Sequence, residues 1–100
     1  MPALPDDVWT LGEVATFSNQ IVDGAGLAAD PGALRLLVKS PAGVVTTYDY
    51  GASAMVREAE GSYALDLALG LAGIWAWRWE ASAPNAAAAE GMLLVKRSRF

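Results

Sequence analysis

The chain has 100 residues, a net charge of −4, and neither cysteine nor histidine. This length suits one domain that buries its core without disulfides or metal, and the missing residues exclude thiol nucleophiles, Cys/His zinc sites and the commonest proton-transfer side chain. The negative charge argues against general nucleic-acid binding, because affinity for the phosphate backbone comes from Lys and Arg.

We expect one domain over residues 1–100, with short tails at 1–8 and 96–100. The first residues carry prolines and acids where a signal peptide has a basic start followed by an apolar run. The longest apolar run, Leu67 to Trp77, is about half of the ~20 residues needed to span a bilayer. We therefore expect a soluble protein without membrane association.

Short segments with period-two hydrophobic alternation follow one another along the chain, separated by Gly, Pro, Asn and Asp. This pattern predicts an all-β, antiparallel sandwich of about six or seven strands. The expected strands lie at 12–18, 33–40, 44–50, 55–57, 61–69, 73–82 and 92–97. A tight turn at 40–43, Ser-Pro-Ala-Gly, joins the second and third of them into a hairpin.

Two segments between the expected strands lack alternation. Residues 19–32 have no clean period and predict a long loop. The alanines at 86–89 are strong helix formers, but they suffice for only one helical turn.

Alternation also predicts which side chains face the core. Each expected core strand has one face that is apolar throughout, and its charged residues lie on the other face, where Leu37 also lies beside Arg35 and Lys39. The predicted core residues are Leu34, Leu36, Val38, Tyr63, Leu65, Leu67, Trp75, Trp77 and Trp79.

The three alternating tryptophans have an alternative interpretation as an exposed ligand platform. Outward tryptophans would send Arg78 and Glu80 into the core, and burying two charges costs several kcal/mol even when they are paired. Burial of each indole is worth about 4 to 6 kcal/mol of gross hydrophobic stabilisation. We therefore predict inward rings, and if one reaches the rim we expect it to be Trp75 or Trp79.

The last expected strand, "MLLV", is apolar on both faces. This indicates either a strand buried on both sides or an outward surface that contacts a partner. The basic terminus that follows is either a solvated tail or a docking segment for an acidic partner. The interface candidates are Leu37, Val45, Met92, Leu94, Lys96, Arg97, Arg99 and Phe100.

Nothing in the chain resembles a catalytic or metal-binding motif. Apart from the adjacent Asp6 and Asp7, the acids are scattered singly, the serines lack a histidine to activate them, and no loop has EF-hand spacing. We expect no enzyme activity, no cofactor and no metal.

Several motifs together resemble a known family. They are Tyr48-x-Tyr50-Gly51, Gly61-x-Tyr63, Gly73-x-Trp75-x-Trp77-Arg78-Trp79-Glu80 and Glu90-Gly91. Between Ala33 and Phe100 the chain is similar to small immunoglobulin-like virion proteins of tailed phages and gene transfer agents. It departs from that pattern in its "SPAG" turn, where the family often has acids, and in its apolar last strand.

The resemblance implies an immunoglobulin-like sandwich with a structural role in the head, neck, decoration, spike-base or fibre region of a virion. It implies binding to further copies of the chain and to other virion proteins, with synthesis in the bacterial cytoplasm. The alternative function is a carbohydrate-binding module for adhesion to a host surface, which would use aromatic residues such as Trp9, Tyr48 or Trp75.

Overall fold

The computed structural model describes residues 7–83 and 86–97, and all regular elements in these ranges are β-strands. There are eight of them: β1 (Asp7–Thr10), β2 (Val14–Gln20), β3 (Leu34–Lys39), β4 (Val45–Asp49), β5 (Val56–Ala59), β6 (Ser62–Ala68), β7 (Gly73–Ala81) and β8 (Ala87–Lys96). The prediction of an all-β protein is confirmed.

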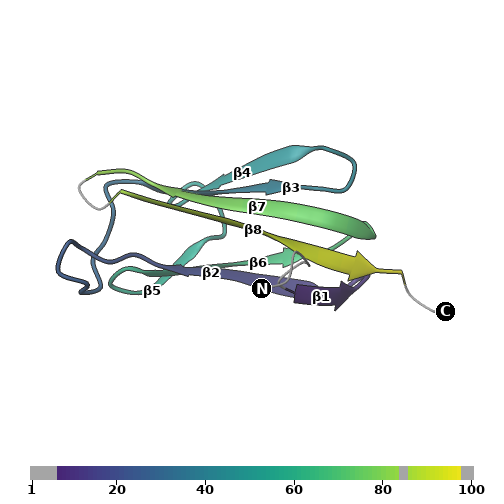
Figure 1. Ribbon diagram of the computed structural model, residues 1–100, viewed down its shortest axis with the longest axis horizontal. Helices are drawn as coiled ribbons and strands as arrows, with labels where there is room; N and C mark the ends of the chain where they lie inside the picture. The colour runs from purple at the N-terminus through teal and green to yellow at the C-terminus, as the bar shows by residue number, and fades with distance from the viewer. Residues whose placement is uncertain (1–6, 84–85, 98–100) are drawn as a thin grey trace.

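The strands form two sheets that face each other as the layers of a sandwich (Figure 1). The five-stranded sheet has the order β1-β8-β7-β3-β4, and the three-stranded sheet has the order β2-β6-β5. All neighbouring strands are antiparallel except β1 and β8, which run parallel. The first strand thus lies beside the last, at one edge of the larger sheet.

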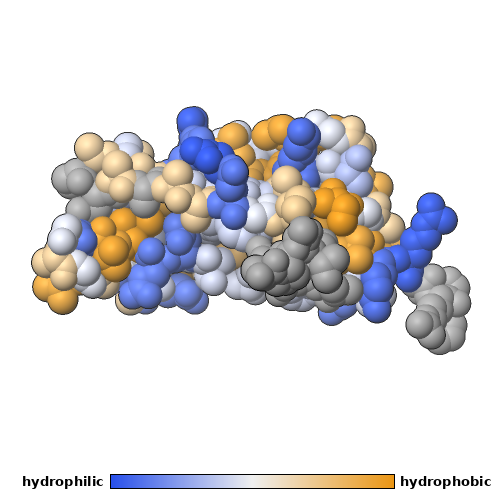
Figure 2. Space-filling view, in the orientation of Figure 1, coloured by the Kyte–Doolittle hydropathy of each residue, from blue (hydrophilic) through white to orange (hydrophobic). Residues whose placement is uncertain are grey.

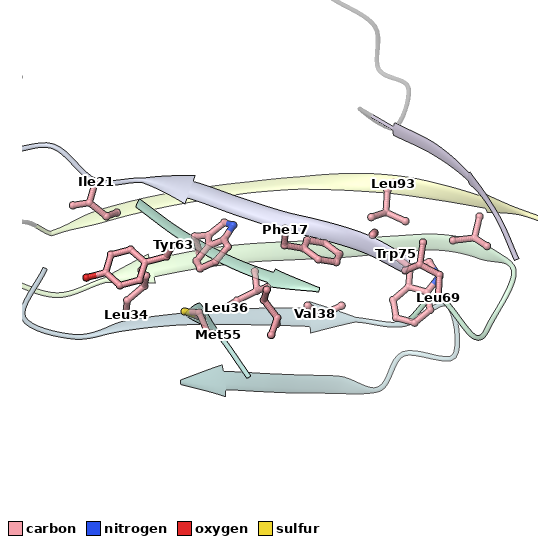
Figure 3. Close-up of a cluster of buried hydrophobic side chains, with 14 residues drawn as sticks. Phe17, Ile21, Leu34, Leu36, Val38, Met55, Tyr63, Leu69, Trp75 and Leu93 are labelled. Carbon is pink, nitrogen blue, oxygen red and sulfur yellow. The ribbon is translucent and has the colours of Figure 1, made fainter. Parts of the chain in front are cut away.

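Apolar side chains from both sheets fill the space between them (Figure 3). Leu36 and Leu69 are 0% exposed, and Trp79 is 2% exposed. Two of the predicted core residues, Leu67 and Trp77, are half-buried and pack against the edge of this cluster. The buried cluster consists of Ala15, Phe17, Ile21, Leu34, Leu36, Val38, Met55, Tyr63, Leu65, Leu69, Trp75, Trp79, Leu93 and Val95.

The predicted hairpin between β3 and β4 forms around the Ser-Pro-Ala-Gly turn. The Gly43 amide donates to the Ser40 carbonyl at 2.9 Å, and the Ser40 amide donates to the Val44 carbonyl at 2.9 Å. Gly43 has a φ of +85°, a conformation that side chains with a Cβ rarely adopt. The turn places Lys39 directly opposite Val45.

The N-terminal tail predicted over 1–8 is too long, because Asp7 and Val8 already belong to β1. Four residues are too few to show an alternating pattern, and β1 forms because β8 offers a free edge for hydrogen bonding. At the other end, Lys96 is the last residue of β8 and is not part of a tail. Residues 1–6 and 98–100 lie outside the described residues.

The alanines at 86–89, which the sequence would allow at most one helical turn, do not form one. Ala87, Ala88 and Ala89 extend β8 and pair with β7, so this strand begins five residues before the expected start at 92. Helix propensity favours alanine by less than about 1 kcal/mol per residue, and one isolated turn cannot persist. Pairing with the adjacent strand supplies backbone hydrogen bonds that the lone turn lacks.

The loop between β2 and β3 is held in place by Asp30. The Asp30 carboxylate accepts hydrogen bonds from the Arg57 guanidinium, the Gly61 amide at 2.8 Å and the Tyr63 hydroxyl at 2.9 Å. These donors, the Arg57 guanidinium above all, hold the pKa of Asp30 well below its usual range. One side chain therefore ties the long loop to β5, to β6 and to the turn between them.

Candidate protein interface

The outer face of the five-stranded sheet collects side chains from four strands. Strand pairing places Leu37 of β3 opposite Thr47 of β4 and Arg78 of β7. In the next outward row, Ala76 of β7 lies between Lys39 of β3 and Met92 of β8. Residues far apart in the chain therefore form one continuous surface.

One end of this face is apolar. Val45 is 54% exposed, Ile74 46% and Met92 43%. Leu37, Ala76 and Leu94 beside them are half-buried. Figure 2 shows hydrophobic surface beside charged surface on the side of the molecule in view. We call this group the apolar patch, and it consists of Leu37, Val45, Ile74, Ala76, Met92 and Leu94.

The other end of the face carries a chain of ion pairs. Glu80 accepts a hydrogen bond from Arg35 Nε at 2.7 Å and another from Arg78 Nε at 2.8 Å. Arg78 Nη1 also donates to Glu90 at 3.1 Å. These partners raise the pKa of Arg78 and lower the pKa of Glu80. Both arginines are thus neutralised within the sheet itself.

Two lysines on the same face have no such partner. Among the described residues, Lys39 and Lys96 form no ion pair. Lys39 lies in the same row as Val45 and Ala76, and Lys96 follows Leu94 on the outer side of β8. The apolar patch is therefore flanked by two positive charges that no ion pair within residues 7–83 and 86–97 neutralises.

The structure brings together five of the eight interface candidates. Leu37, Val45, Met92, Leu94 and Lys96 all lie on this outer face. Arg97 is exposed just after β8, whereas Arg99 and Phe100 lie outside the described residues. Sequence reasoning missed Ile74, Ala76 and Lys39, although the alternation in "GIWAWRWE" and "LRLLVKS" already placed all three outward.

The tryptophan face of β7 points into the sandwich, but the expectation about its rim is wrong. Trp75 is 8% exposed and Trp79 2%, whereas the middle ring, Trp77, is half-buried. Trp77 lies opposite Gly91, which has no side chain to cover it, and β1 pairs only with residues 93–96 of β8. The ring therefore emerges where the neighbouring strand offers least cover.

Two hollows at the open sides of the sandwich contain aromatic residues. A crevice of about 140 Å³ lies between Trp9, Phe17 and Trp77, and the Trp9 indole nitrogen is buried there without a hydrogen-bond partner among the described residues. A cleft of about 420 Å³ is lined by Tyr48, Trp75 and apolar residues of both sheets. Only the second falls within the ~300–1,000 Å³ range of small-molecule sites.

In residues 7–83 and 86–97, no group of three or more acids is arranged to hold a metal ion. The same ranges contain no helix with the length and hydrophobicity to cross a bilayer.

No protein-family model matches the chain, and no curated protein matches it significantly.

Proposed function

We propose that this protein is a non-enzymatic assembly module, a structural component of a tailed phage or phage-like particle in its head, neck or head-spike/fibre region. In this role it binds neighbouring copies and other virion proteins through the outer face of its five-stranded sheet. The observation that carries the proposal is the apolar patch, because a group of exposed apolar side chains on a sheet face commonly marks a contact with another protein.

An immunoglobulin-like sandwich is part of the proposal. The order β2-β6-β5 corresponds to immunoglobulin strands B, E and D, and β8-β7-β3-β4 corresponds to G, F, C and C′. The buried Trp79 packs between the two sheets from β7, which is strand F of this assignment, whereas antibody domains carry their core tryptophan on strand C. The location in a particle rests on the sequence motifs around Tyr48, Gly61 and Trp75–Glu80.

The interface is tested by changing Met92, which is 43% exposed and lies opposite Ala76 in the apolar patch. Met92→Glu is expected to abolish association of the purified chain with itself or with a particle protein, because it puts a charge into a surface that binding would dehydrate. Leu27→Glu is the matched control, since Leu27 is 66% exposed and lies in the loop between β2 and β3. Sedimentation velocity and pull-down measurements should separate the two variants, and equal behaviour would argue against this face.

The location is tested by mass spectrometry of particles purified from a producing bacterium. Peptides of this chain should co-purify with capsid and tail proteins at a fixed ratio through a density gradient. Absence of these peptides from the particle fraction would contradict the proposed location in a virion.

Carbohydrate binding is the second candidate function. The cleft that contains Tyr48 and Trp75 has the size of a ligand site and an aromatic wall, and aromatic rings stack on sugar rings. Titration with a panel of oligosaccharides would then quench tryptophan fluorescence, and Tyr48→Ala would weaken the response. An unchanged spectrum across the panel would count against it.

A further inference from the structure

The outer face of the three-stranded sheet differs in charge from the outer face of the five-stranded sheet. The strands β2, β5 and β6 contain one basic residue, Arg57, and its guanidinium is turned to Asp30. The charged residues that face outward are Glu58 and Asp66, both exposed. We call this surface the acidic face, and it consists of Val14, Thr16, Val56, Glu58, Ala64 and Asp66.

The acidic face is also shaped to receive side chains. A shallow hollow of about 480 Å³ lies on it, with the small residues Ala54 and Ala64 among its lining and with Glu58 and Asp66 beside them. Val14 and Val56 on the same face are 56% and 58% exposed. The surface therefore combines exposed apolar groups, a depression and two carboxylates. Asp66 accepts a hydrogen bond from the Thr16 hydroxyl at 2.6 Å, and neither Glu58 nor Asp66 forms an ion pair in the part of the chain that the structure describes.

The apolar patch has the complementary set of features. Its Met92 and Ile74 side chains are exposed on a sheet face, and Lys39 and Lys96 flank it without an ion-pair partner among the described residues. The two outer faces point in opposite directions from the sandwich (Figure 1). They cannot meet within one molecule, but they can meet between two.

We propose that copies of this chain stack front to back, with the apolar patch of one copy packed on the acidic face of the next and Lys39 and Lys96 opposite Glu58 and Asp66. Packing the same face of two copies together would bring lysines near lysines or acids near acids, and like charges across an interface oppose association. A front-to-back contact is heterologous, so it repeats and builds a ring or an open stack. The proposal rests on the proposed function and names the partner of its interface as a second copy.

The test reverses the charge of one face at a time in the full chain. Lys39→Glu/Lys96→Glu is one variant, and Glu58→Lys/Asp66→Lys is the other. Each is expected to weaken self-association by roughly tenfold or more in sedimentation velocity, because each creates a contact between like charges. Circular dichroism and thermal melting of each variant establish that it is folded.

Mixing the two variants is the decisive measurement. In an equimolar mixture, every contact between unlike variants again joins opposite charges, so self-association should return to near the wild-type level. Raising the salt concentration should weaken the wild-type stack, because it screens exposed charges. Both results together support front-to-back stacking.

Two outcomes would overturn the stack while leaving the proposed function open to its own tests. In the first, Glu58→Lys/Asp66→Lys associates like the wild type while Met92→Glu does not, which would indicate another partner for the apolar patch. In the second, the wild-type chain remains monomeric at every concentration. The proposed function would then be decided by co-purification with particles.

Discussion

Asp30 and Arg57, 27 residues apart in the chain, form a two-point ion pair. Arg57 Nε donates to Asp30 Oδ1 at 3.1 Å and Nη2 donates to Oδ2 at 2.9 Å. The pair connects the loop between β2 and β3 to β5, an edge strand of the smaller sheet. Such a planar, two-point geometry is more specific than a single contact between charges.

The first prediction concerns the pH dependence of this pair. Arg57, Gly61 and Tyr63 lower the pKa of Asp30 below its ordinary value of 3.8 in the native state. The free energy that these hydrogen bonds to the Asp30 carboxylate add to the native state is therefore fully present above the ordinary pKa. It is lost as the pH falls below that value toward the lower pKa of Asp30 in the folded protein. Asp30→Asn should lower the urea midpoint of unfolding at pH 7. The difference in urea midpoint between this variant and the wild type should shrink as the pH is lowered from about 5 to about 2.

Arg57→Gln is the companion variant, because it removes the same pair from the other side. The difference in urea midpoint between Arg57→Gln and the wild type should also shrink as Asp30 is protonated. A difference that stays constant across this pH range would show that the ion pair is not its source.

The second prediction concerns the backbone at Gly61. This residue has a φ of +74°, and a Cβ added there would lie 2.5 Å from the Ile21 carbonyl oxygen and 2.8 Å from the Ala29 nitrogen. Gly61→Ala should therefore cost about 1–3 kcal/mol or more in the free energy of unfolding. Gly24→Ala is the control, since an added Cβ meets nothing within 4 Å there. The free energy of unfolding of this variant should lie within about 1 kcal/mol of the wild-type value.

The third prediction compares the two faces of the larger sheet. Leu36 is 0% exposed and lies between Tyr48 and Trp79 in the strand register. Leu36→Ala should cost about 2–5 kcal/mol in the free energy of unfolding, because it leaves a cavity in the core. Val45→Ala on the outer face should change that free energy by about 0.5 kcal/mol or less. Similar losses for both variants would contradict the assigned faces.

The fourth prediction concerns solvent access to the tryptophans. Trp77 is half-buried, whereas Trp79 is 2% exposed. Trp77→Phe should therefore remove more of the acrylamide-quenchable fluorescence than Trp79→Phe does. If Trp79→Phe removes more quenchable fluorescence than Trp77→Phe, the Trp77 ring is shielded from solvent in solution. Shielding by a neighbouring copy would decrease when the protein is diluted.

The sequence by itself determined the fold class and the direction of most side chains. In "ALRLLVKS" and "GIWAWRWE", period-two alternation separates inward from outward residues, because successive side chains of any β-strand point to opposite faces. The cost of burying Arg78 and Glu80 was enough to orient the tryptophans. The hairpin at Ser40–Gly43 was equally local, since Pro and Gly select the turn.

Only the tertiary structure decided which outward residues become neighbours. Leu37, Ile74 and Met92 form one patch because β7 lies between β3 and β8, and this order depends on pairing between strands distant in sequence. The same pairing turned Ala87–Ala89 into a strand and left Trp77 opposite Gly91. A local sequence pattern predicts which face of the sheet a side chain lies on. The register between strands distant in sequence decides which side chains become its neighbours. The sequence therefore predicted single interface residues, and only the paired sheet shows that they form one surface.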